Sequence, residues 1–453
     1  MQYTEVNLPS KTERDTSRED HIVSGGTRTK RPSRSRRSRS CRQTCTRLSH
    51  SLTCTYSLTM CRAITKALCY LVLAVVALLC AFGAWCSTTP IPEGTMFATV
   101  IPLFQGRLPQ TLFGTMVKPS TPAVPADMEP LPRPAKEKFA VLPGTGDKMP
   151  LNGLGMCCRA SAYDDESVRR TVLWYLLQGG RHIDTAMLYL NHKPIGMAIE
   201  EAIARGVPRS EIFLVTKLTD RAYSKGKETI DGLLLEFARD LRVEYLDLVL
   251  LHVPRPFIAL GHTCSDWSKC RVSAWKALAE AKKRGVVRNI GVSNFDVKQL
   301  SELSALPEAA DAPIAANQIQ LSPFAPSFAF ETARWCQEHG VAVVAHSPLA
   351  GAFFKAKAVT HKTIQSIAAK HDSLRSPTQV LLKWAIQKGY GVIPGSGNPE
   401  HQRSNLQIYD AELSSADMAK LDGLKDDDSF MYMDMREAKG EGGAAGEGIK
   451  DEP

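Results

Sequence analysis

The chain has 453 residues and a formal net charge of +9, which first suggests nucleic acid or an anionic membrane as a partner. Residues 1–66 carry 14 basic and 5 acidic side chains, so the remaining residues carry 42 of each and are neutral overall. The excess positive charge therefore belongs to the N-terminal tail, and the rest of the chain gives no reason to expect nucleic acid. A hydrophobic content of 43% is sufficient for a globular core.

The first 137 residues lack the periodicity of a folded domain. Residues 1–59 are rich in Ser and Arg and predict a disordered basic tail, with RNA association as an alternative role. Residues 60–88 contain an uncharged apolar run at 67–85, which is long enough to cross a hydrocarbon layer of about 30 Å. Residues 89–137 are rich in Pro and Thr and predict a flexible linker.

The apolar run has two interpretations. Basic residues precede it and no Lys or Arg follows until Arg107, so the positive-inside rule predicts a signal anchor that holds the protein at a membrane through residues 67–85. A start at Met60 instead of Met1 makes the same run a secretory signal peptide. The layout also resembles two-part sequences that direct proteins onward to a plastid. If the N-terminal segment is a gene-model artefact, the alternative location is cytoplasmic.

From Lys138 onward, short apolar segments alternate with amphipathic ones. The first of these, residues 138–150, predicts a β-hairpin with Gly144 and Gly146 in its turn. Strands are expected at 152–156, 181–185, 212–218, 245–252, 288–294, 316–321, 341–347 and 391–396. Helices are expected at 166–180, 195–206, 227–242, 273–285, 296–306, 330–340 and 376–389. This alternation predicts an α/β fold, a closed (β/α)8 TIM barrel at 138–425, followed by a flexible C-terminal tail at 426–453.

Polar side chains end most of the predicted strands, and four residues form a candidate catalytic group: Asp184, Tyr189, Lys217 and His252. A tyrosine hydroxyl has an ordinary pKa of about 10 and donates a proton poorly at neutral pH unless a nearby cation favours the phenolate. Lys217 can be that cation, Asp184 can keep it charged, and His252 can orient a carbonyl oxygen. The group predicts reduction of a C=O bond with Tyr189 as the proton donor.

These residues lie in motifs that resemble those of the aldo-keto reductase family. In chain order the motifs are MPLNGLG, GGRHIDTAMLYLN, TKL, LLHVP, IGVSNF, NQIQLSPF, AHSPLA and IPGSGNPEH. The resemblance implies NAD(P)H-dependent reduction of an aldehyde or ketone. It also implies cofactor binding by Ser293, Asn294, Gln318, His346, Ser347, Leu349, Gly395, Ser396, His401 and Asn405. Of these, Ser293, Asn294 and Gln318 would bind the nicotinamide carboxamide, whose donor and acceptor suit amide and hydroxyl groups.

The chain departs from the family pattern at two places. His346 stands where the family usually has a tyrosine that stacks on the nicotinamide. Gly395 replaces the usual lysine of the phosphate loop and His401 the usual arginine, although Arg403 is close by in the sequence. The loss of these charges weakens recognition of the adenosine 2′-phosphate. NADPH is therefore the expected cofactor, with NADH as the alternative.

Substrate choice is expected to depend on the loop at 253–272, where Trp267 and Phe257 either line the pocket or pack within the loop. An aldehyde or small ketone is the expected substrate. No cysteine or histidine spacing is typical of a metal site. The alternative function is that of a cofactor-binding regulatory subunit of a membrane protein, since some relatives in the family accompany membrane channels.

The cysteines of the predicted barrel do not have the spacing of a disulfide scaffold. Cys157 and Cys158 are expected to be a small buried pair beside the first strand. Cys264 and Cys270 are expected to be free thiols in the loop at 253–272, with a regulatory disulfide as the alternative.

Overall fold

The computed structural model describes residues 120–158, 164–255, 264–351 and 354–436. The predicted basic tail, the apolar run at 67–85 and the linker up to residue 119 lie outside these residues. Within the described ranges, no helix has both the length and the apolar character needed to cross a membrane.

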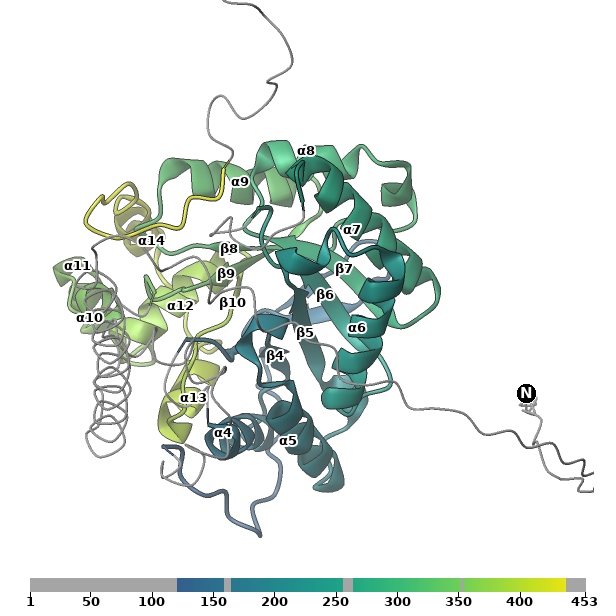
Figure 1. Cartoon of the computed structure of the whole chain (residues 1–453). Coiled ribbons are helices and arrows are strands. Elements are labelled where there is room, and N and C mark those ends of the chain that lie inside the picture. Colours follow the sequence, from purple (N-terminus) through teal and green to yellow (C-terminus); the bar gives the residue numbers. More distant parts are fainter. Residues whose placement is uncertain (1–119, 159–163, 256–263, 352–353, 437–453) are drawn as a thin grey trace, which may run out of the picture. The chain divides into compact units, whose positions relative to one another are not determined.

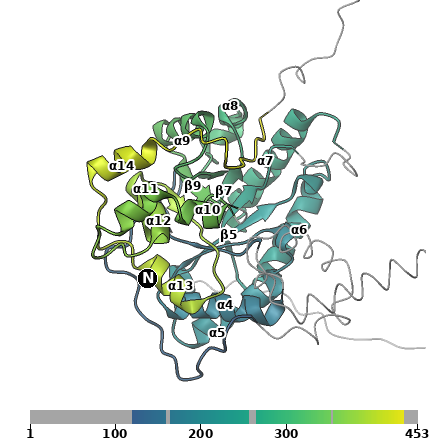
Figure 2. The same cartoon turned by 90° about the vertical axis from the view of Figure 1, so that its left-hand side faces the viewer.

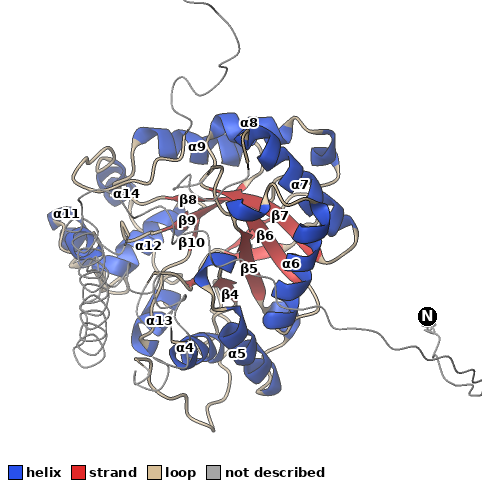
Figure 3. Cartoon of the chain, in the orientation of Figure 1, coloured by secondary structure: helices blue, strands red, loops and turns tan. Residues whose placement is uncertain are grey.

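Eight parallel strands form one sheet in which β3 to β10 are neighbours in chain order. A parallel bridge between Asn152 and Val392 joins the two ends of this sheet, so the sheet closes into a barrel, which occupies the centre of Figure 3 with helices around it. This confirms the predicted (β/α)8 barrel. The strands are β3 (Leu154–Gly155), β4 (His182–Asp184), β5 (Phe213–Leu218), β6 (Leu246–Leu251), β7 (Val287–Ser293), β8 (Ala316–Gln320), β9 (Ala342–His346) and β10 (Gly391–Val392).

The helices surround the barrel in chain order (Figure 1). The seven predicted ones are α4 (Asp165–Leu177), α5 (His192–Ala204), α6 (Lys227–Asp240), α7 (Trp267–Lys283), α8 (Val297–Ser304), α9 (Ser327–Glu338) and α12 (Pro377–Gln387). Four short ones were not predicted: α10 (Lys355–Val359), α11 (Lys362–Ala368), α13 (Pro399–Leu406) and α14 (Ser415–Asp422). Helix α7 begins six residues earlier than expected because Asp266 caps it, accepting a hydrogen bond from the backbone of Lys269.

The predicted hairpin is present and closes the N-terminal end of the barrel. Strands β1 (Phe139–Val141) and β2 (Lys148–Pro150) pair in antiparallel fashion. Leu142 and Met149 are buried in one apolar cluster with inward-facing barrel residues such as Val215 and Leu248. The hairpin therefore fills the N-terminal end of the barrel. The polar residues lie at the opposite, C-terminal ends of the strands, where they surround the mouth of the barrel.

The last part of the predicted linker packs on the barrel. Residues 120–137 run beneath α4 and α5, where they are drawn in blue in Figure 2. The hydroxyl oxygens of Thr121 and Thr171 lie 2.9 Å apart, and the backbone N–H of Leu131 donates to the carbonyl of Leu177 over 2.7 Å. The Pro- and Thr-rich composition suggested flexibility, but backbone carbonyls and hydroxyls of this segment are hydrogen-bonded to the outer helices.

Gly179 provides a test of the packing between residues 120–137 and α4. A Cβ atom at Gly179 would approach the carbonyl oxygen of Pro132 to 2.4 Å, and its φ of +92° is unfavourable for alanine. Gly285, at φ +79°, has no atom within 4 Å of the same position and is the matched control. We expect Gly285→Ala to lower the free energy of unfolding by about 1 kcal/mol and Gly179→Ala by ~2–4 kcal/mol in urea titrations. Equal losses would show that residues 120–137 do not pack on α4.

Candidate active site

A buried ion pair lies at the mouth of the barrel. The ammonium Nζ of Lys217 donates to Oδ1 of Asp184 over 2.5 Å and to the carbonyl of Thr185 over 3.0 Å. The lysine side chain is 0% exposed and the aspartate side chain 2%. The pair forms because β4 and β5 are neighbours with Asp184 opposite Val215, and Lys217 is the next residue of β5 on the inner face.

Burial sets the electrostatics of this pair. Removal from water lowers the pKa of Lys217 below its ordinary value, and the charge and hydrogen bond of Asp184 oppose that shift. The second oxygen of Asp184 accepts a hydrogen bond of 2.7 Å from Nε2 of Gln318. The carboxylate is therefore hydrogen-bonded through both oxygens, as a buried charge requires.

Tyr189 and His252 lie against this pair. Tyr189 ends a short 3-10 helix, η2 (Met187–Tyr189), that follows β4. Its ring centroid is 5.1 Å from Nζ of Lys217 and 5.7 Å from the ring of His252, which it meets edge-on. The structure thus brings Asp184, Tyr189, Lys217 and His252 together from three strands and one loop.

His252 is an uncharged imidazole. Burial lowers its pKa well below the ordinary value, and the positive charge of Lys217 adds to that effect. Its Nδ1 atom is buried and has no hydrogen-bond partner among the described residues. A buried ring nitrogen without a partner is costly in a protein, and such atoms are often found where a ligand completes the site.

The loop that carries Tyr189 is hydrogen-bonded to the residue that follows β3, the first strand of the barrel. Asn191, directly before α5, donates from its side chain to the carbonyl of Met156 over 2.9 Å. Its Oδ1 accepts a hydrogen bond of 2.6 Å from the hydroxyl of Thr185. Asn191 and Thr185 are both buried. This arrangement holds the loop between β4 and α5 against the end of β3.

The predicted nicotinamide residues lie side by side on the neighbouring strands β7, β8 and β9 or directly after them. Ser293 is opposite Gln318, and its hydroxyl donates to the carbonyl of Gln318 over 2.9 Å. The Nδ2 of Asn294 donates to the carbonyl of His252 over 3.0 Å, and its Oδ1 lies 2.8 Å from Nε2 of His346. The bond from Gln318 to Asp184 was not predicted, because no local sequence signal relates two residues on non-adjacent strands.

His346 is neutral in this setting. Burial, followed by the charge of Lys217, lowers its pKa to about 3. The neutral ring donates from Nε2 to Oδ1 of Asn294, and its Nδ1 lies 3.3 Å from the hydroxyl of Ser347. The ring is therefore held in one orientation by two side chains of the same mouth.

The predicted phosphate-binding residues lie beyond β10. Strands β9 and β10 are neighbours, so the loop that contains Gly395 and Ser396 follows the strand next to His346. Gly395, His401 and Arg403 are exposed, the last two on α13, which Asn398 caps by accepting from the backbone of residues 400 and 401. Ser347 and Leu349 follow β9, and Leu349 is buried. Asn405 is buried near the end of α13, where its carbonyl accepts from Asn152.

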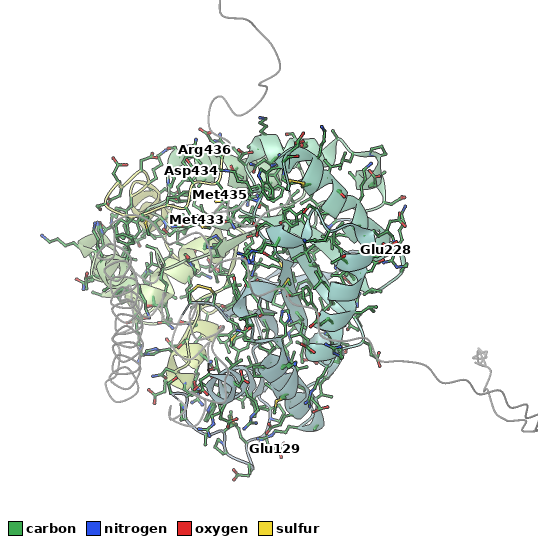
Figure 4. The ribbon with its side chains drawn as sticks, viewed as in Figure 1. Glu129, Glu228, Met433, Asp434, Met435 and Arg436 are labelled. Carbon is green, nitrogen blue, oxygen red and sulfur yellow. A yellow bond between two sulfur atoms is a disulfide. The ribbon has the colours of Figure 1, made fainter. Side chains whose placement is uncertain are left out.

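The start of the predicted C-terminal tail lies at the mouth. The side chain of Gln320, at the end of β8, donates to the carbonyl of Met431 over 2.8 Å and accepts from the N–H of Met433 over 2.9 Å. The guanidinium of Arg436 lies 3.6 Å from the ring centroid of Phe328 on α9. Figure 4 labels Met433 to Arg436 of this segment. Residues 426–436 are thus held on the barrel, while residues from 437 onward lie outside the described part.

The predicted substrate-pocket residues are only partly described. Phe257 lies outside the described residues. Trp267 is the first residue of α7 and is half-buried against the apolar core. Beside this loop, the side chain of Arg255 donates to the carbonyl of Arg436 over 3.0 Å. The contact between the loop after β6 and the C-terminal segment had no signal in the sequence.

Both expectations for the cysteines were wrong. Cys264 and Cys270 form a disulfide, with an S–S distance of 2.09 Å, rather than two free thiols. The first turn of α7 brings them within bonding distance. Cys157 and Cys158 are also bonded to each other and are not buried, since Cys158 is exposed and Cys157 half-buried. They lie beyond the end of β3, where the chain leaves the core.

Comparison with known proteins identifies the family of this chain. A model of the Aldo/keto reductase family matches residues 152–426, more than half of the chain. The chain belongs to the aldo-keto reductase family. This confirms the resemblance drawn from the motifs.

Several aldo-keto reductases show the extent of the similarity. Methylglyoxal reductase DkgB of Escherichia coli O157:H7 is 36% identical over 267 residues, which cover 59% of this chain and 91% of that protein. Aldo-keto reductase family 1 member A1 of Sus scrofa is 32% identical over 302 residues, 63% of this chain and 88% of that protein. The crystal structure of an aldo/keto reductase from Brucella melitensis has a TM-score of 0.53 and 30% identity, and covers 64% of this chain and 99% of that one. The protein is thus an NAD(P)H-dependent oxidoreductase.

A double-mutant cycle tests the ion pair. Removing either partner leaves the other charge buried and unpaired, so we expect Asp184→Asn and Lys217→Met each to lower the free energy of unfolding by about 3–5 kcal/mol. The double variant contains neither charge and should lose less than the sum of the two single losses. Urea unfolding at pH 7 measures all four proteins. Additive losses would mean that the two charges do not interact.

Proposed function

We propose that the protein reduces an aldehyde or ketone to an alcohol, with NADPH as the preferred cofactor and Tyr189 as the proton donor. The observation that supports this most directly is the buried ammonium of Lys217, 5.1 Å from the ring of Tyr189 and paired with Asp184. An ammonium at this distance, in surroundings poor in water, lowers the energy of the phenolate and so makes the hydroxyl a stronger acid.

When bound, NADPH supplies the hydride that goes to the carbonyl carbon. The carbonyl oxygen gains negative charge as the hydride arrives, and Tyr189 donates its hydroxyl proton to that oxygen. Lys217 stabilises the phenolate that remains, while Asp184 holds the ammonium in place. Proton donation from a positioned side chain is worth about 10²–10⁴-fold in rate.

His252 is proposed to orient the carbonyl oxygen. Its ring meets that of Tyr189 edge-on and stays uncharged at neutral pH, because burial and Lys217 both lower its pKa. A neutral imidazole can donate one hydrogen bond to the substrate without competing with Tyr189 for the transferred proton. The unpartnered Nδ1 atom agrees with a site that a ligand completes.

The residues present suit a nicotinamide nucleotide. Neutral His346 offers a flat ring that two hydrogen bonds hold in place, and it does not repel the positive charge of an oxidised nicotinamide. At the other end, the exposed Arg403 lies on α13, which begins near Gly395 and Ser396. The positive end of the helix dipole favours a phosphate near Gly395 and Ser396, and Arg403, in the last turn of α13, adds a positive charge on the same helix.

The names of relatives guide the choice of substrates to test. Two of them are described as a methylglyoxal reductase and, in Trypanosoma cruzi, a 9,11-endoperoxide prostaglandin H2 reductase. A panel for this protein should therefore contain small aldehydes, ketones and larger apolar carbonyl compounds. Carbonyl-dependent oxidation of NADPH by the full chain is the direct assay.

Tyr189→Phe tests the proton donor. Loss of the hydroxyl should lower kcat by at least about 100-fold, because no other group replaces its proton, while the Kd for NADPH changes little. Tyr245→Phe is the matched control, since Tyr245 lies before β6 at the opposite end of the barrel, stacked on Arg209. Turnover by Tyr189→Phe at the wild-type rate would reject Tyr189 as the acid.

Gly395→Lys tests the cofactor preference. Gly395 is exposed, so a lysine has room to reach a phosphate. One added charge at a solvent-accessible phosphate should raise the NADPH/NADH ratio of kcat/KM by about three- to tenfold. Gly395→Met has a similar length without charge and should leave the ratio unchanged. The same ratio in the wild type and Gly395→Lys would place the 2′-phosphate elsewhere.

A further inference from the structure

The adjacent cysteines Cys157 and Cys158 lie at the mouth of the barrel. Strand β3 ends at Gly155, which pairs with Asp184, and the N–H of Met156 donates to the carbonyl of Asp184 over 2.9 Å. The two cysteines follow immediately and are bonded to each other. Cys157 and Cys158 thus lie one and two residues after Met156, whose backbone N–H binds Asp184 of the candidate catalytic group.

A short series of hydrogen bonds connects this pair to the loop of Tyr189. The carbonyl of Met156 accepts from the side chain of Asn191, and Asn191 in turn accepts from the hydroxyl of Thr185. The carbonyl of Thr185 accepts from Lys217. The carbonyl of Met156 thus holds Asn191 at the end of the loop between β4 and α5, and Asn191 holds Thr185 at its start. A change in the chain direction after Met156 would move this carbonyl and so affect both ends of the loop.

The pair is accessible and conformationally constrained. Cys158 is exposed and Cys157 half-buried, and exposed disulfides are the ones that exchange readily with thiols. Cys158 has a φ of +64°, in the left-handed region that cysteine rarely adopts. With the bond between the cysteines open, residue 158 can return to a common backbone conformation.

We propose that Cys157 and Cys158 form a redox-controlled site, at which thiol–disulfide exchange with a dithiol alters the Tyr189 loop and so the rate of carbonyl reduction. The inference about rate rests on the function proposed above. The inference about the loop stands on its own, because it concerns the hydrogen bond between Asn191 and Met156.

The chemistry is a two-electron exchange. A thiolate of the dithiol attacks the sulfur of Cys158, the exposed residue of the pair, and the Cys157 thiolate leaves and takes up a proton. The second thiol of the dithiol then attacks the mixed disulfide, which releases Cys158 as its thiolate, and this is protonated in turn. The protein disulfide gains two electrons and two protons, and the dithiol becomes a cyclic disulfide. An oxidised dithiol reverses both steps.

The test compares the full chain after treatment with oxidised or reduced dithiothreitol. Alkylation and mass spectrometry establish the state of residues 157 and 158. Reduction should increase hydrogen exchange of the backbone amides in segment 185–192. It should also lower kcat/KM for a carbonyl substrate about fivefold, which is what a change of ~1 kcal/mol gives at 1.36 kcal/mol per factor of ten.

Two variants separate this pair from the other disulfide. Cys157→Ser combined with Cys158→Ser should abolish the response to dithiothreitol in both measurements. Cys264→Ser combined with Cys270→Ser should retain the response, because it removes only the bridge at the start of α7.

Each negative result has a distinct meaning. A pair that stays as thiols after oxidative treatment, or equal exchange of segment 185–192 in both states, overturns the redox site. A change in exchange with unchanged kcat/KM overturns the control of rate. An absence of turnover in both states contradicts the proposed function, while the exchange measurement still decides whether the pair controls the loop.

Discussion

The candidate active site depends on the ion pair between Lys217 and Asp184, which is almost completely removed from water. Such a pair is weak evidence for stability, because the cost of dehydrating two charges can exceed their attraction. It persists here because the surrounding strands satisfy it, through the carbonyl of Thr185 and the amide of Gln318. The arrangement places a positive charge 5.1 Å from the ring centroid of Tyr189, which is the charge that the proposed proton donation requires.

Burial keeps the neighbouring imidazoles uncharged, and the charge of Lys217 adds to that effect. His252 and His346 both have lowered pKa values, through burial first and Lys217 second, so both are neutral at pH 7. The positive charge beside Tyr189 is therefore that of Lys217. Asn294 connects the two histidines, since it donates to the backbone carbonyl of His252 and accepts from the ring of His346. The side-chain amide of Asn294 thus links His252, on the proposed substrate side of the mouth, to His346, on the proposed cofactor side.

Segments outside the repeating barrel pattern are held mainly by hydrogen bonds that involve the backbone. Residues 120–137 bind to the outer helices, and residues 426–436 bind to Gln320 and Arg255 at the mouth. The first segment was expected to be flexible because it is rich in Pro and Thr, and the second because it precedes a Gly- and Glu-rich end. Backbone carbonyls accept hydrogen bonds whatever the side chain, so composition alone carries little information about such contacts.

The barrel could be predicted from the sequence, because apolar strands that alternate eight times with amphipathic helices are the pattern of a closed parallel barrel. The sequence also indicated Asp184, Tyr189, Lys217 and His252, since each stands at or just beyond a strand end with a side chain suited to proton transfer. The contacts of these side chains could not be predicted, because they join residues that are far apart in the sequence. The bond from Gln318 to Asp184 and the neutral state of His346 arise from distances and burial that exist once the strands have closed into a ring.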